Sequence, residues 1–280
     1  MNWPIFEHEY LRHAILAGAC AGIACGVVGV FVVTMHLAFL GVCIAHAAFA
    51  GALLGVWLGF DPMIGALAFS VGAAAVIGPL ADRGDLAPDT SVGIVFSLML
   101  GLAFLFLGMA GSSRANVIGL LSGSILTVTR QDLAFLAGTA GCIVLLVVLF
   151  YKEIHAVVCH RHVALAVGIP ATAVFYAILF ATGVTIAVSL QSVGGMLIFS
   201  LVLCPAAAAL QLTYRFTWLL VLASVFGVLS CWAGLAASYL WDLNAGAAIV
   251  ITASVLFAVA SIFSPKRRAK PRKARPSHGV

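Results

Sequence analysis

Long apolar runs separated by short polar or turn-forming segments occupy most of this sequence. They fall near residues 14–34, 39–58, 62–81, 92–111, 133–151, 169–189, 193–211, 216–240 and 245–263. A helix needs roughly 20 mostly apolar residues to cross a bilayer, and the runs lack the in/out alternation of membrane β-strands. The pattern therefore predicts an all-α polytopic membrane protein with about eight to nine transmembrane helices.

The segments between and within the runs carry several structural signals. Residues 58–62 and 241–246 predict tight turns, and residues 118–126 predict a short helix that dips into the membrane surface. Small residues spaced three or four apart let helices approach closely; the first run has them at Gly18, Gly22, Gly26 and Gly29.

Two further signals lie around the seventh run. Proline inside a transmembrane helix frees a carbonyl and often marks a bend, so Cys204-Pro205 predicts a kink or break in this run. Gly194-Gly195 predicts a flexible or closely packed start of the same span.

Composition supports the membrane assignment. The chain is 64% hydrophobic and 8% charged, with a mean hydropathy of +1.19, whereas soluble domains carry roughly a quarter charged residues. The acidic residues fall at the ends of the runs or between them. We expect a single transmembrane domain over residues 1–264.

The net charge of +5 comes mainly from one end of the chain. Seven of the 14 Lys and Arg residues lie between Lys266 and Arg275, so the rest is slightly acidic and a nucleic-acid partner has little support. Basic segments next to a membrane span mark the cytoplasmic side. We expect residues 265–280 to form a disordered, cytoplasmic basic tail.

Neither the cysteines nor any nucleotide motif predicts catalysis. The seven cysteines are scattered without a CxxC pair, which argues against a disulfide framework or a zinc ribbon. The sequence has no P-loop pattern, so any ATP must be hydrolysed by another chain. We expect a translocation subunit with no catalytic residues and no permanently bound cofactor.

His46 is the ionisable residue inside an apolar run. Ionisable side chains at membrane depth are costly and usually face a pathway or a bundle interior, so His46 is a candidate transient metal ligand. The alternative is a packing histidine bonded to nearby backbone. Cys43, three residues earlier on the same helical face, is either a second ligand or a small buried residue.

Two other groups carry possible metal ligands. Glu9 and His13 share a helix face, and together with His8 they could receive a metal at the outer mouth, although interfacial polar residues need no such role. Residues 151–170 predict a short helix along the cytoplasmic face, stopped by Gly168 and Pro170. It is either a plain connector or a docking helix for a cytoplasmic motor, and its histidines are ordinary interface residues or an exit site.

Four segments together resemble ABC-type zinc/manganese permeases. Residues 40–51 are similar to the second-span G-D-A-[IL]-[SA]-H-A motif, and residues 120–133 to an external segment of that family. Residues 188–197 with 204–209 resemble V-x-L-Q-x-V-G-x-L-L followed by P-A-A-T-A, and residues 242–250 resemble D-L-P-S-G-A-A-I-V. The matches run in order from about residue 14 to 264.

This resemblance implies a BtuC-like type II ABC importer permease fold in the bacterial inner membrane. It implies a homodimer with two cytoplasmic ABC ATPases and an external metal-binding protein. It also makes residues 160–168 the coupling helix that contacts the ATPase, with the coupling residues His160, Arg161, His162, Val163, Ala164 and Gly168.

One departure from the family bears on the cargo. Val42 stands where the family has an aspartate, and His with Cys suits zinc better than manganese. We therefore predict uptake of a divalent metal ion, zinc ahead of manganese. The alternatives are a permease for a metal chelate or other small solute, an ATP-independent secondary carrier, and a non-transporting sensor or scaffold.

Overall fold

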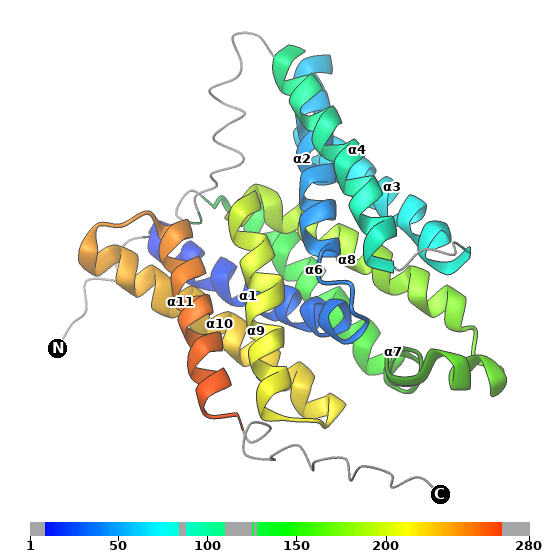
Figure 1. Cartoon of the computed structure of the whole chain (residues 1–280). Helices are drawn as coiled ribbons and strands as arrows, with labels where there is room; N and C mark the ends of the chain where they lie inside the picture. The colour runs from blue at the N-terminus through cyan, green and yellow to red at the C-terminus, as the bar shows by residue number, and fades with distance from the viewer. Residues whose placement is uncertain (1–8, 84–87, 110–124, 126–127, 265–280) are drawn as a thin grey trace, which may run out of the picture.

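The computed structural model describes residues 9–83, 88–109, 125 and 128–264, and within them every regular element is helical. Figure 1 shows the helices, which are α1 (Glu9–Thr34), α2 (Leu40–Leu58), α3 (Pro62–Arg83), α4 (Pro88–Met109), α6 (Arg130–Leu149), α7 (Tyr151–Ala166), α8 (Ala171–Val193), α9 (Gly195–Leu212), α10 (Phe216–Trp241) and α11 (Ala245–Ile262). Residues 118–126, apart from Ile125, and the tail at 265–280 lie outside the described part.

Eight helices of the described part are long and apolar enough to cross a membrane, and α9 is a shorter apolar helix. This agrees with the predicted eight to nine spans. Gly194 (φ 100°) separates α8 from α9, which is why the seventh run yields the shorter helix. Of the kink or break predicted at Cys204-Pro205, the break does not occur, because α9 continues through Pro205 to Leu212; a kink stays a prediction.

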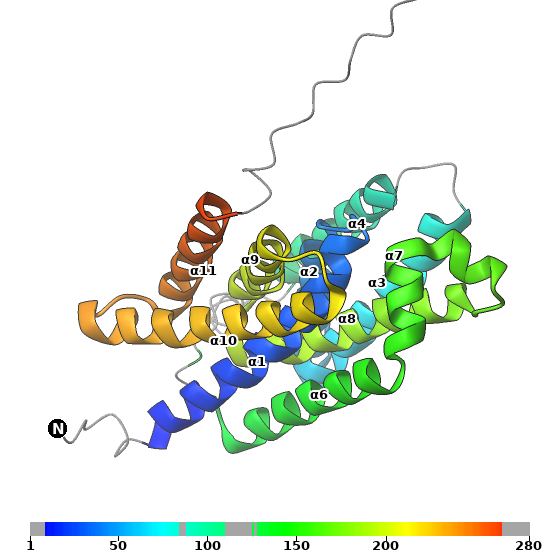
Figure 2. The same cartoon turned by 90° about the horizontal axis from the view of Figure 1, so that it is seen from below.

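Helix α1 lies at the centre and packs against α6, α8, α9 and α10 (Figure 2). The glycine face predicted from the sequence makes its crossing with α10. A Cβ atom added to Gly22 would lie 2.6 Å from the carbonyl carbon of Gly227, and one added to Gly26 would lie 2.7 Å from the oxygen of Ala223. The two backbones therefore touch without intervening side chains, as that spacing predicts.

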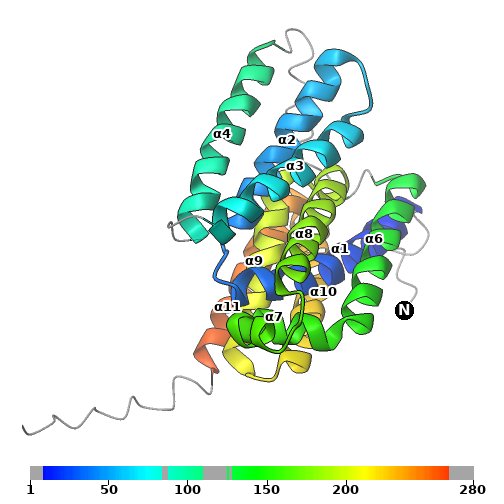
Figure 3. The same ribbon diagram turned by 90° about the vertical axis from the view of Figure 1, so that its right-hand side faces the viewer.

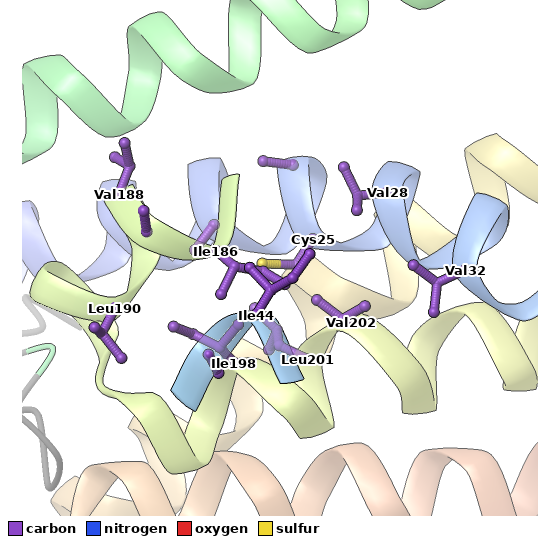
Figure 4. Close-up of a cluster of buried hydrophobic side chains, with 14 of the residues drawn as sticks. Cys25, Val28, Val32, Ile44, Ile186, Val188, Leu190, Ile198, Leu201 and Val202 are labelled. Atoms are coloured by element: carbon purple, nitrogen blue, oxygen red, sulfur yellow. The ribbon is translucent and has the colours of Figure 1, made fainter. Parts of the chain in front are cut away.

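Helices α2, α3 and α4 form a second group, seen at the top of Figure 3. Here α2 and α3 meet at Gly51 and Gly65, where a Cβ on Gly51 would lie 2.6 Å from the carbonyl carbon of Gly65. On its other side α2 packs against α8 and α9. Figure 4 shows this junction as one apolar cluster of side chains from α1, α2, α8 and α9, including Val28, Ile44, Ile186, Ile198 and Leu201.

The buried polar side chains make hydrogen bonds inside the protein. Three of them in α8 donate to carbonyl oxygens one turn earlier in the same helix: Thr182, Thr185 and Ser192. In the part of the chain that the structure describes, no buried side-chain nitrogen or oxygen lacks a hydrogen-bond partner. Among these described residues, the buried side-chain nitrogen and oxygen atoms are therefore already engaged within the protein.

Candidate functional site

His46 lies in the second turn of α2, and its ring is fixed by a backbone hydrogen bond. Nδ1 lies 2.9 Å from the carbonyl oxygen of Val42. Because a carbonyl oxygen only accepts, Nδ1 is the donor, and the neutral ring then keeps a lone pair on Nε2. Such a bond is what a packing histidine makes, but it is also how metal-ligating histidines are usually oriented.

Aromatic side chains hold the other side of this ring. Phe96 of α4 meets His46 edge to face, with ring centroids 5.1 Å apart and an interplanar angle of 83°. Phe39, just before α2, packs on Phe96 in the same way at 4.9 Å. His46 itself is half-buried. Nothing in the local sequence pattern pairs residue 96 with residue 46, so sequence reasoning missed Phe96.

The two neighbours of His46 on its helix differ in burial. Val42, one turn earlier, is half-buried and brings no ligand atom. Cys43 has no exposed surface and belongs to the apolar core. In this conformation a metal at His46 therefore does not reach Cys43 from the protein surface, although both residues were predicted as ligands.

The described residues of one chain do not complete a metal site. No group of three or more His, Cys, Asp or Glu side chains that could hold a metal occurs in them, whereas resident zinc sites use three or four protein ligands. Of the residues predicted at the outer mouth, His8 lies outside the described part. Glu9 begins α1, and His13 is half-buried one turn later.

The predicted surface helix is present as α7, and it ends where the sequence indicates. Gly168 is left-handed (φ 86°). Its N–H donates to the oxygen of Leu165, and the N–H of Ile169 donates to that of Ala164, which is the hydrogen-bond pattern of a glycine-terminated helix. The segment 160–168 is therefore not a separate helix. It comprises the last turns of α7, which begins at Tyr151 and ends at Ala166, and the turn that follows α7.

Side chains at both ends of α7 tie it to the spanning helices. The Arg161 guanidinium lies 4.6 Å from the ring centroid of Phe175 in α8, a cation–π contact. At the other end His155 stacks on Tyr151, with centroids 5.9 Å apart, and packs 5.0 Å from Phe216 of α10. A displacement of α7 would therefore be transmitted to α8 and α10 through these side-chain contacts.

The last turns of α7 also present apolar side chains to the outside. Val163, Leu165 and Val167 are 59%, 49% and 74% exposed, whereas Ala164 is buried against the bundle. Helix α7 is not among the helices long and apolar enough to span a membrane, and exposed apolar surface of this kind marks a contact with another protein or with the membrane surface. For His160 and His162 the structure describes the helical backbone alone.

Comparison with known proteins identifies a family over nearly the whole chain. The model of the family described as the ABC 3 transport family matches residues 7–264. The manganese transport system membrane protein MntC of Halalkalibacterium halodurans is 33% identical to this chain over 264 residues, covering 94% of this chain and 90% of that protein.

Two solved structures share the arrangement of helices. A chain in the structure of PsaBC from Streptococcus pneumoniae in complex with a Fab is 30% identical, with a TM-score of 0.84 and coverage of 95% of this chain and 96% of that one. A chain in an inward-facing conformation of an ABC transporter is 15% identical, with a TM-score of 0.74 and coverage of 92% and 87%. This second likeness concerns the fold alone.

Proposed function

This chain belongs to the ABC 3 transport family, and from that premise we propose that it is the permease subunit of an ATP-driven importer for a divalent transition-metal ion. It is a multi-pass membrane protein with the predicted all-α fold of a type II ABC importer permease. A relative that is 33% identical is named as a manganese transport protein, so manganese is the first cargo to test. Zinc, predicted from Cys43 beside His46, is the second, because Cys43 is buried.

The observation that carries this proposal is the orientation of His46. Its Nδ1 proton is held by the Val42 carbonyl, which leaves Nε2 as a ligand atom at membrane depth. Binding there replaces part of the hydration shell of the ion, and because each copy supplies one imidazole the site stays weak enough for release.

The ligand set points to two copies of the chain. In the described residues, one copy offers His46 without two further His, Cys, Asp or Glu ligands, and the buried side-chain nitrogen and oxygen atoms there already have hydrogen-bond partners. We infer that the ion passes along the surface of each bundle, which a homodimer would convert into an enclosed path with His46 from both copies. The bacterial inner membrane and an external metal-binding protein complete the proposed system.

Uptake by His46 variants tests this proposal. Loss of an outer-shell partner of a metal ligand costs roughly 10- to 100-fold, so we expect His46→Ala, which removes the ligand itself, to lower manganese uptake by at least that much. The amount of protein in the membrane should be unchanged; a radioactive ion measures uptake and an immunoblot measures the protein. His36→Asn is the control, because His36 is exposed in the turn before α2. Wild-type uptake by His46→Ala would remove His46 from the path, and competition with zinc would rank the two ions.

We further propose that the exposed face of α7 docks an ABC ATPase. Alternation of the spans places α7, the turn before α10 and the end of α11 at one membrane surface, along the lower side of Figure 1. Basic residues Lys152, Arg161 and Arg215 lie in these segments, so the positive-inside rule favours this surface as cytoplasmic. The C-terminus would then also be cytoplasmic.

Co-purification tests the docking surface. Val163→Glu places a charge on the exposed face of α7, and we expect the ATPase to be lost from the purified membrane complex. Leu243→Glu is a matched control, because Leu243 is a 51% exposed apolar residue in the turn at the far end of α10. Equal retention of the ATPase by both variants would exclude α7 as its docking site.

A further inference from the structure

A long groove on the outside of the bundle has no role in the proposed ion path. Its volume is about 610 Å³. Its floor is formed by Ile23 and Val27 of α1, and its walls come from α6, from α10 and from Tyr151 of α7. Helices α6 and α10 both pack on α1 (Figure 2). Wall residues such as Val148, Val221 and Trp232 are 67%, 46% and 46% exposed, so the groove is open to the surroundings of the spans.

The groove offers few polar atoms to a polar ligand or a hydrated cation. Four lining residues carry polar side-chain atoms: Tyr151, Thr217, Ser224 and Trp232. The Tyr151 and Thr217 hydroxyls bond each other at 2.7 Å, Ser224 donates to the oxygen of Leu220, and the Trp232 indole donates to that of Ile15. Since these atoms are already engaged, the occupant that fits is an apolar chain.

The length and the charges of the groove narrow the occupant further. Along α10 it runs from Thr217 to Trp232, about 22 Å at the rise of an α-helix. This exceeds the roughly 15 Å that one leaflet contributes to a 30 Å hydrocarbon core, so the groove is long enough for a whole acyl chain. One end carries two exposed cations: Arg215 precedes Thr217 by two residues, and Lys152 follows Tyr151. The half-buried Glu153 is the acidic residue beside them.

From these features we infer that the groove between α1, α6 and α10 binds an anionic phospholipid. One acyl chain lies along Val27, Val148 and Val221, and the headgroup phosphate meets Lys152 and Arg215. In a bilayer an acyl chain gains little by exchanging lipid for protein contacts, so the cations supply the preference for an anionic headgroup. Each of the two cations, Lys152 and Arg215, should raise the affinity for an anionic lipid by about fivefold. This inference does not depend on the identity of the transported ion.

Native mass spectrometry of the purified full-length protein tests the groove, with phosphatidylglycerol and phosphatidylcholine added in detergent. Val225 lines the groove and is 45% exposed, so Val225→Trp places a bulky side chain in it. Val259→Trp on α11 is the matched control, because Val259 lies outside the groove lining and has nearly the same exposed fraction, 46%. We expect Val225→Trp to reduce bound phosphatidylglycerol severalfold, and Val259→Trp to leave it unchanged. Equal binding by both variants would overturn the inference.

A second variant tests the headgroup contact. Lys152→Gln combined with Arg215→Gln should reduce the preference for phosphatidylglycerol over phosphatidylcholine by about 25-fold, fivefold for each charge. Wild-type protein that binds both lipids equally would contradict the assignment. If Val225→Trp instead converts dimers to monomers in the same spectra, the groove is a contact between copies and the lipid inference is wrong.

Discussion

At the residue scale, the backbone carbonyl one turn earlier determines the tautomer and the orientation of the His46 ring. The Val42 oxygen takes the Nδ1 proton at 2.9 Å, while Phe96 limits rotation of the ring from α4. Backbone geometry thus sets the tautomer, and the side chain at position 42 is free to differ without loss of that bond. Since valine brings no oxygen ligand, its replacement is the most direct test of how this position selects the ion.

We predict that Val42→Asp shifts uptake toward manganese. A carboxylate four residues before His46 lies on the same helix face, and oxygen ligands suit manganese better than zinc. The ratio of manganese to zinc uptake should rise relative to wild type in a competition assay. Val42→Asn, which has the same shape without the charge, should shift this ratio less; an unchanged ratio for Val42→Asp would place residue 42 off the path.

At the element scale, α7 shows what the sequence predicts well. Gly168 and Pro170 predict its end because local chemistry decides a helix terminus, and the helix does end at Ala166. The contacts of Arg161 with Phe175 and of His46 with Phe96 were not predictable, because they join residues of different helices whose packing no local pattern encodes. Proline does not end α9 at residue 205 for a related reason: apolar helices in membranes tolerate proline where neighbours satisfy the freed carbonyl.

The left-handed glycine at the end of α7 leads to a prediction about the stability of this helix end. Gly168→Val should destabilise the turn by roughly 1–2 kcal/mol, because a β-branched residue resists φ 86°. Gly168→Asn should cost less, since asparagine also occurs at this cap position. Thermal unfolding of the purified protein measures both. If α7 couples to the ATPase, transport by the valine variant should fall more than binding of the ATPase does.

At the scale of the whole molecule, the crossing of α1 with α10 supports the arrangement of the other helices. Gly22→Leu would drive a side chain into the backbone of Gly227, and we predict little folded protein in the membrane. Gly101→Leu is the control, because a Cβ there meets nothing within 4 Å. Fluorescence-detected gel filtration measures both. Equal folding of the two variants would mean that the α1–α10 crossing is adjustable.

Orientation is a second property of the whole molecule. We predict that a variant retaining Cys159 as its sole cysteine reacts with a membrane-impermeant maleimide in inside-out vesicles and not in intact cells. Burial raises the pKa of the Cys159 thiol, and the thiolate is the reacting form, so labelling should be slower than for a free thiol and should accelerate as pH rises. Labelling in intact cells would reverse the proposed topology.

The glycine contacts also bear on how such a protein can change shape. Where two backbones touch directly, as at Gly22 with Gly227 and at Gly51 with Gly65, no rotamer change can let one helix slip past the other. Each pair is then expected to tilt as a rigid block. Opening and closing would fall to the boundary between the blocks, where Ile44 and its neighbours meet α8 and α9 through side chains large enough to repack.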